Sequence, residues 1–231
     1  YMITFGKIRQ RLPSNFEIVM GNSVLERVKS IKYLGVMFDE KFKWNEHVSY
    51  LAKKLACSAG VLSKLRYYTN MTTLLRVYDS LITSRLTYGL NVWGAACKTT
   101  LQPLRVIQNR AVRFISRASR FRRLDLDYLN LRLLKLDDLY QLSIYKFMHQ
   151  YYNKKLPDYF INFISSQHNT SQNTRSTESS QYKSIKCNKK LMERSIRLVG
   201  PKLWTLVPAT KRILSGKLFK KEYVNLLLAK Y

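Results

Sequence analysis

From residue 44 onward, the apolar residues of this chain recur every three or four positions, which is the spacing of one face of an α-helix. The pattern continues to the end of the sequence, with one polar interruption near residues 165–185 that we expect to form a flexible loop. The predicted helices begin at Trp44, at Thr72 or Thr73, at about Leu101, at Asp137 or Asp138, and near Phe219. The sequence therefore predicts a mainly α-helical fold arranged as a bundle.

Two of these predicted helices have well-defined apolar faces. The first helix is expected to bury Val48, Leu51, Ala52, Leu55, Ala59 and Leu62. The third, predicted to end at about Arg120, is expected to bury Leu104, Ile107, Ala111, Phe114, Ile115 and Ala118. Each helix therefore has a second face that is free to carry polar and charged side chains.

The residues ahead of the first helix have β character. Residues 16–20 and 24–28 are β-prone runs on either side of Gly21-Asn22, a pair that favours a tight turn. Residues 31–38 form a further β-prone run. We expect a small antiparallel sheet or a pair of hairpins before the helical bundle.

The charge of the chain indicates its kind of partner. The sequence has 41 Lys and Arg against 14 Asp and Glu, a net charge of +27. This excess is spread along the whole chain, and a protein with so many like charges repels itself unless a polyanion neutralises it. Nucleic acid is the usual polyanion, because Lys and Arg release counterions from phosphates. An anionic membrane surface is the competing choice, and the sequence has no apolar run long enough to span a membrane.

The cations of the first and third helices fall opposite the apolar faces. Lys53, Lys54 and Lys64 lie on the outer face of the first helix. At 100° per residue, the arginines of the third helix gather on one side, namely Arg110, Arg113, Arg117 and Arg120. A solvated face without a partner is the plainer interpretation, but this surplus lacks interleaved acids, which favours phosphate binding.

The acidic residues do not form a recognisable catalytic site. Two-metal chemistry needs at least two close carboxylates, and Asp137-Asp138 is the one adjacent pair of aspartates. This pair opens a predicted helix, where Asp caps free N–H groups and suits the helix dipole. We therefore predict that the pair is a helix cap, and that the chain carries no catalytic and no metal-binding residues.

The cysteines and histidines also lack a site pattern. Cys57, Cys97 and Cys187 form no CxxC pair, so we expect small buried or half-buried residues in a reducing, intracellular compartment. The three histidines, His47, His149 and His168, have no ligand spacing and are expected to take ordinary polar roles.

Several short sequence motifs, taken in order, resemble motifs in the reverse transcriptases of non-LTR (LINE-type) retrotransposons. The Jockey- and CR1-like branches are the most similar. The motifs are Lys32-Tyr33-Leu34-Gly35 within residues 26–39, Phe42-Lys43-Trp44, Leu86-Thr87-Tyr88-Gly89, Gln108-Asn109-Arg110-Ala111, and Gly200-Pro201-Lys202-Leu203-Trp204. Together they cover nearly the whole chain.

The resemblance implies a division of the chain into three parts. Residues 1–44 would be the end of the palm, with Tyr33, Leu34 and Gly35 as the primer-grip hairpin. Residues 45–124 would be a thumb-like bundle that holds duplex through the cations named above, and residues 125–231 a C-terminal helical region. The palm aspartates and their Mg²⁺ ions would lie upstream of residue 1, together with the fingers. The expected partners are RNA, DNA or an RNA–DNA hybrid, in the nucleus and cytoplasm.

Three alternatives stay open at this stage. The chain could be a domesticated basic module that binds RNA or DNA without polymerase activity. It could also be a scaffold whose charge serves an acidic protein or a membrane. Within the hairpin, Tyr33 and Leu34 could be buried strand residues with Gly35 at a bulge.

Overall fold

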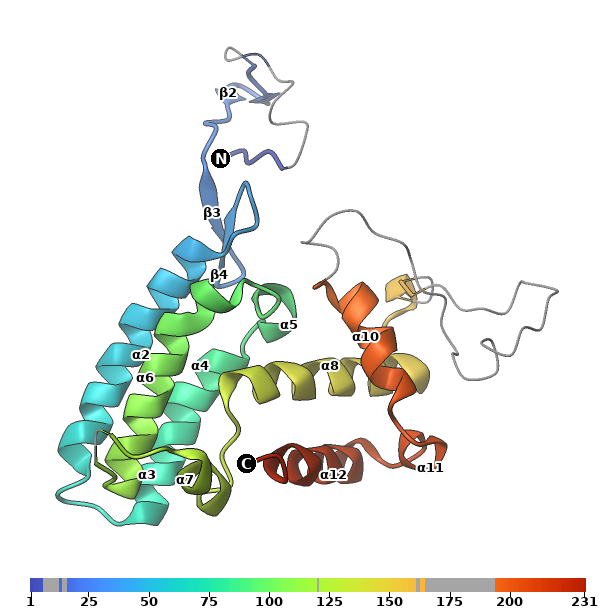
Figure 1. The fold of residues 1–231 in the computed structure, drawn as a ribbon. Coiled ribbons are helices and arrows are strands. Elements are labelled where there is room, and N and C mark those ends of the chain that lie inside the picture. The colour runs from blue at the N-terminus through green and yellow to red at the C-terminus, as the bar shows by residue number, and fades with distance from the viewer. Residues whose placement is uncertain (6–12, 14–15, 120, 161–162, 165–193) are drawn as a thin grey trace.

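The computed structural model describes residues 1–5, 13, 16–119, 121–160, 163–164 and 194–231 (Figure 1). Arg120, His168, Cys187 and the predicted loop at 165–185 lie outside the described residues. The described part is mainly helical, with two short antiparallel hairpins ahead of the first helix, so the predicted fold class is confirmed.

The two hairpins follow one another along the chain. Strand β1 (Val19–Met20) pairs with β2 (Ser23–Val24) around the predicted turn, and β3 (Ser30–Tyr33) pairs with β4 (Val36–Asp39). The first hairpin is shorter than the sequence predicts. The second one folds back on itself within residues 31–38 and contacts the first helix through β4.

The first helix, α2 (Asn45–Leu65), begins directly after the second hairpin. The Asp39 carboxylate accepts hydrogen bonds from the backbone N–H groups of Lys43 and Trp44, both at 2.9 Å, which fixes the chain reversal ahead of the helix. The apolar face that we predicted for this helix is buried, apart from the half-buried Ala52.

A second helical segment returns along α2. It consists of α3 (Met71–Tyr78), the π-helix η1 (Asp79–Thr83) and α4 (Ser84–Thr87). Asn70 caps this segment, because its side chain accepts a hydrogen bond from the Thr73 N–H at 2.9 Å. The predicted cap at Thr72 or Thr73 was wrong, since both residues already lie inside α3.

After the short helix α5 (Leu90–Trp93), α6 (Lys98–Ser116) lies side by side with α2 and completes a three-helix bundle (Figure 1). Helix α6 ends at Ser116 rather than near Arg120, because Arg117 adopts a left-handed conformation with φ of 53°. The last predicted turn of this helix is therefore absent.

The remaining helices surround α8 (Leu136–Tyr152). Helix α7 (Asp125–Asn130) precedes it, and α10 (Ile196–Thr205) and α12 (Gly216–Leu228) both pack on it, joined by α11 (Ala209–Arg212) (Figure 1). A 3₁₀ turn, η2 (Asp158–Phe160), follows α8. Aromatic contacts hold α12 against α8, with the Phe219 ring centroid 4.3 Å from that of His149 and the Tyr223 ring centroid 4.5 Å from that of Tyr145.

Gln108 of α6 anchors the start of α8 to the bundle. Its side-chain oxygen accepts from the Leu136 N–H at 2.9 Å. Its amide nitrogen donates to the Leu134 carbonyl at 2.9 Å and to the Tyr78 hydroxyl at 3.1 Å. Gln108 is buried, so these bonds satisfy polar groups of two other segments, α3 and the start of α8, away from water.

Asp137 and Asp138 do not cap α8, which corrects our prediction. Asp137 forms an ion pair with Arg105 at 2.7 Å, and Asp138 accepts a hydrogen bond from the Tyr231 hydroxyl at 2.6 Å. The same hydroxyl accepts from the Lys135 N–H at 2.8 Å. Instead, Gln108 and Tyr231, from distant segments, accept hydrogen bonds from the backbone N–H groups of Leu136 and Lys135 at the start of α8.

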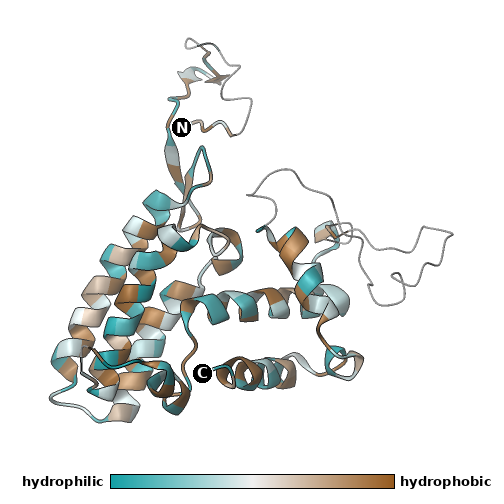
Figure 2. Cartoon of the chain, viewed as in Figure 1, coloured by the Kyte–Doolittle hydropathy of each residue, from teal (hydrophilic) through white to brown (hydrophobic). Residues whose placement is uncertain are grey.

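The hydrophobic core runs as one cluster from β4 through both groups of helices to α12. Figure 2 shows helices with mixed surfaces, hydrophilic residues alternating with hydrophobic ones, as expected where one face is buried. In the part of the chain that the structure describes, no helix is both long enough and apolar enough to cross a membrane.

Candidate nucleic-acid interface

The turn of the second hairpin lies at the surface, at the end of the bundle where α2 begins (Figure 1). Tyr33 is 63% exposed and Leu34 is 72% exposed, so the alternative of two buried strand residues is wrong. Leu34 and Gly35 have φ of 45° and 79°, which is the left-handed geometry of a tight turn. The turn therefore exposes its backbone and the Tyr33 side chain to solvent.

The segment Thr87-Tyr88-Gly89, at the end of α4, holds this turn in place. The Tyr88 hydroxyl donates to the Leu34 carbonyl at 2.7 Å. A Cβ at Gly35 would lie 3.1 Å from the Tyr88 ring, and a Cβ at Gly89 would lie 3.1 Å from Val36. Both glycines are thus needed for the close contact between the hairpin and the end of α4.

His47 of α2 joins the second hairpin to the bundle. Its Nδ1 accepts from the Met37 N–H at 3.3 Å, and its ring centroid is 5.4 Å from that of Trp93. Burial disfavours the charged imidazolium and lowers the pKa of His47 below its ordinary value. The imidazole is accordingly kept neutral and able to accept this hydrogen bond.

A cationic cluster lies beside the hairpin, and we call it the Tyr50 cluster (Lys32, Tyr50, Lys54 and Arg85). Lys32 Nζ donates to the Tyr50 hydroxyl at 3.3 Å, and Lys54 Nζ is 4.6 Å from the Tyr50 ring centroid. Hydrogen bonding to Lys54, and then to Lys32, lowers the pKa of Tyr50. Arg85 donates to the Lys54 carbonyl at 3.0 Å. The hairpin, α2 and α4 thereby contribute cations to one place.

A second cluster lies at the opposite end of α2, and we call it the Arg66 patch (Arg66, Tyr67, Arg110, Phe114 and Arg117). The Arg66 guanidinium carbon is 4.6 Å from the Tyr67 ring centroid and 5.5 Å from that of Phe114. Arg110 is 5.7 Å from the Phe114 centroid, and Arg117 donates to the Arg66 carbonyl at 3.1 Å. This patch joins the ends of α2 and α6.

The structure brings together only some of the predicted cations. Arg110 and Arg117 meet in the Arg66 patch, although Arg117 lies beyond the helix end. Arg113 is half-buried and lines a pocket beside α7, where its Nε has no hydrogen-bond partner among the described residues. Lys53 and Lys64 are exposed along α2.

Sequence reasoning missed Lys32, Arg66 and Arg85. The signal for Arg66 was the basic-aromatic run Arg66-Tyr67-Tyr68, which breaks the helical periodicity at the end of α2. Lys32 and Arg85 give no signal along the chain, because only the packing of the hairpin and α4 against α2 brings them to Lys54.

The bundle itself is almost free of acidic residues. Residues 47–124 contain 14 Lys and Arg and a single acid, Asp79, a net charge of 14 − 1 = +13. Internal ion pairs therefore cannot neutralise this surface, and an external polyanion is the natural counter-charge.

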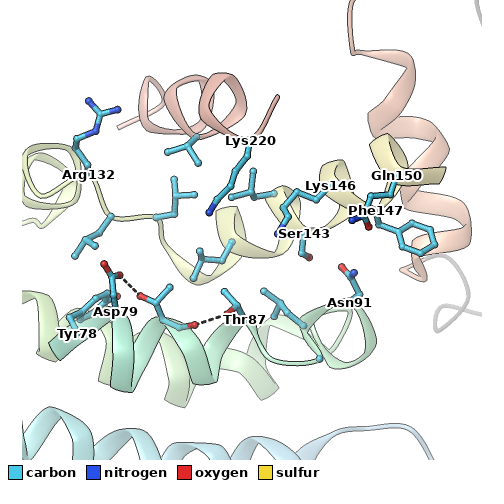
Figure 3. Close-up of a pocket in the computed structure, with 18 residues that line it drawn as sticks. Tyr78, Asp79, Thr87, Asn91, Arg132, Ser143, Lys146, Phe147, Gln150 and Lys220 are labelled. Atoms are coloured by element: carbon cyan, nitrogen blue, oxygen red, sulfur yellow. Dashed lines mark hydrogen bonds between the residues drawn. The ribbon is translucent and has the colours of Figure 1, made fainter. Parts of the chain in front are cut away.

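A groove of about 490 Å³ separates η1 from α8 and α12. Several leucines line it, and Lys146 and Lys220 reach into it from α8 and α12 (Figure 3). Asp79 lies across the groove and accepts from the Thr83 hydroxyl at 3.0 Å. Among the described residues that line the groove, Asp79 is the one carboxylate, so this arrangement suits the binding of an anion better than two-metal chemistry.

The described residues contain no group of three or more His, Cys, Asp or Glu side chains close enough to hold a metal ion. Cys57 and Cys97 are exposed thiols, which corrects our prediction that they would be buried or half-buried. The Cys97 Sγ accepts a hydrogen bond from the Arg194 guanidinium at 2.9 Å.

Comparison with known proteins defines the class to which this chain is related. It matches no protein-family profile and no solved structure. Its curated relatives are RNA-directed DNA polymerases of mobile elements, at about 27% identity over part of the chain. The resemblance to reverse transcriptases that the sequence motifs suggested is confirmed to this extent.

Three relatives from Drosophila melanogaster illustrate the match. The polymerase of the mobile element jockey is 27% identical over 134 residues, covering 57% of this chain and 15% of the relative. The probable polymerase of transposon BS is 28% identical over 110 residues, covering 45% and 12%. The probable polymerase of the X-element is 27% identical over 88 residues, covering 37% and 10%. The chain thus spans only a small part of the length of these relatives.

Proposed function

We propose that the chain is the thumb-containing, C-terminal part of a reverse transcriptase and that it grips the primer–template duplex. The observation that carries this proposal is the bundle of residues 47–124, which contains 14 Lys and Arg and a single acid. A thumb tracks the backbone of a duplex without reading its sequence, and that task needs many unpaired cations on rigid helices.

The exposed hairpin supports a primer-grip role in the same proposal. The turn at Leu34 and Gly35 is exposed, so its backbone can approach a terminal phosphate, and the exposed Tyr33 ring can stack or donate a hydrogen bond. Tyr88 acts as a positioning residue, because its hydroxyl fixes the Leu34 carbonyl within the turn. Polymerisation itself, with its Mg²⁺ ions, would be the task of the palm and fingers of the same polyprotein.

Binding of the full 231-residue chain to an RNA–DNA hybrid at low salt tests this proposal. We expect Lys53→Glu with Lys64→Glu to weaken binding by about tenfold or more, because two phosphate contacts become repulsive. Both side chains are exposed, so α2 should keep its helical circular dichroism signal. Fluorescence anisotropy of a labelled hybrid measures the affinity.

Lys202→Glu with Lys217→Glu is the matched control, since it changes the net charge equally on α10 and α12. We expect this control to stay within about threefold of the unchanged chain. Equal losses in both variants would mean that net charge alone attracts the hybrid. A chain that binds no nucleic acid at low salt would contradict the proposal and favour the scaffold alternative.

A further inference from the structure

The Arg66 patch lies beside aromatic rings that a duplex backbone would not use. Tyr67 is 70% exposed and Tyr68 is 86% exposed, in the turn that follows α2. Covering such rings removes apolar area from water, which a phosphate oxygen cannot do. These rings therefore indicate a ligand with flat, apolar faces.

Guanidinium groups and rings alternate across this patch. Arg66 lies over both Tyr67 and Phe114, and Arg110 lies over Phe114 as well. Arg117 is held beside them by its hydrogen bond to the Arg66 carbonyl. Positive charges thus lie beside the exposed Tyr67 side chain and the half-buried Phe114 ring, on a framework formed near the ends of two helices.

The charges of the patch have no acidic counterpart nearby in the sequence. No Asp or Glu occurs between Glu46 and Asp79, and α6 contains none. The three guanidinium groups near the ends of α2 and α6 carry like charges, so they repel each other and attract an anion. A ligand that combines an anionic group with a flat ring would satisfy both features of the surface.

We propose that the Arg66 patch, together with Tyr68, binds unpaired nucleotides that flank the duplex. The bases stack on Tyr67 and Tyr68, and the phosphates bind Arg110 and Arg117. A base pair inside the duplex cannot make this contact, because its neighbours in the helix cover both of its faces, and the end pair of a blunt duplex offers only one face. This inference rests on the proposed function, since it extends the same nucleic acid beyond the gripped duplex.

The position of the patch fits this division of tasks. Helix α2 has 21 residues, and at 1.5 Å per residue it is about 30 Å long. The hairpin turn lies at its start and the Arg66 patch at its end (Figure 1). The two ends of the bundle can therefore contact different parts of one nucleic acid.

The test compares a blunt RNA–DNA hybrid with the same hybrid carrying a short single-stranded extension. Because each tyrosine stacks a base, we expect Tyr67→Ala with Tyr68→Ala to weaken binding of the extended hybrid by roughly thirtyfold or more. Binding of the blunt hybrid should stay within about twofold, because its phosphate contacts remain. Anisotropy with each labelled hybrid measures both affinities.

Two further variants keep the result interpretable. Tyr67→Phe with Tyr68→Phe retains the rings and should bind the extended hybrid as the unchanged chain does. Tyr159→Ala removes a tyrosine that is 87% exposed near η2 and should have no effect on either hybrid. Circular dichroism and thermal unfolding of all variants verify that the bundle is folded.

The inference is overturned if the alanine variant binds the extended hybrid normally, or loses both hybrids to the same degree. Failure of the proposed function looks different. In that case the unchanged chain would not bind the blunt hybrid, whereas the Tyr67 and Tyr68 dependence on the single-stranded extension could still be measured.

Discussion

Single residues decide how the hairpin meets the bundle. Gly35 and Gly89 have φ of 79° and 61°, and each lies against a side chain of the other segment. A side chain at either position would strain the backbone and press on Tyr88 or Val36. Two segments that stand more than fifty residues apart in the sequence therefore act as one structural unit.

His47 makes this unit sensitive to pH. Its folded pKa lies below the ordinary value of 6.5, because burial disfavours the charged form. The unfolded chain therefore binds the proton first as the pH falls. The contribution of His47 to stability is complete above about pH 6.5 and is lost as the pH falls through the folded pKa.

We expect the free energy of unfolding to fall between about pH 7 and pH 5 more steeply in the unchanged chain than in His47→Gln. The glutamine can still accept a hydrogen bond but does not titrate. Urea unfolding at a series of pH values measures both slopes. Parallel curves for the two proteins would show that the pKa of His47 is the same in the folded and unfolded chain.

At the scale of the elements, periodicity predicted α2, α6, α8 and α12 and the segment from α3 to α4, but it predicted neither their ends nor the shorter helices α5, α7, α10 and α11. The buried face of α2 matches the predicted one closely, because an apolar stripe along one side of a helix is removed from water only when that side packs against the core. The ends of α3, α6 and α8 depend on Asn70, on the left-handed Arg117 and on Gln108. Several neighbouring polar residues could end each of these helices, and the tertiary packing determines which of them does so.

Gln108 offers a direct measure of how firmly the elements are joined. We expect Gln108→Leu to lower the free energy of unfolding by about 2–4 kcal/mol, because it leaves buried polar groups of Leu134, Leu136 and Tyr78 unsatisfied. Urea denaturation measures the loss. Gln102→Leu, at an exposed position of the same helix, should change stability by no more than about 0.5 kcal/mol. Similar values for both variants would mean that Gln108 does not anchor α8.

The whole molecule is defined by a charge that its own acids cannot balance. Exposed cations occur along α2 and at the ends of α2 and α6, within a chain of net charge +27. Charge at this scale governs attraction to a polyanion and its dependence on salt, and it leaves the fold undetermined.

If the five exposed and predicted cations each contact one phosphate, the logarithm of the binding constant should fall with the logarithm of salt concentration at a slope of about −4 to −5. These cations are Lys53, Lys54, Lys64, Arg110 and Arg117. Lys53→Glu with Lys64→Glu should make the slope less steep by about 2, because two phosphate contacts are lost. Anisotropy titrations between about 50 and 200 mM salt measure it, and a slope close to zero would contradict a phosphate-tracking role.

The sequence by itself determined the helical class, the hairpins ahead of the bundle, the cationic surface and the relation to reverse transcriptases. Each of these depends on the order of residues within short windows or on sums over the chain. Only the tertiary structure decided that Tyr88 holds the Leu34 turn, that Arg117 meets Arg66, and that Gln108 and Tyr231 replace the aspartates at the start of α8. These contacts join residues far apart in sequence, and no local pattern records which distant side chain will satisfy a buried polar group once the core has closed.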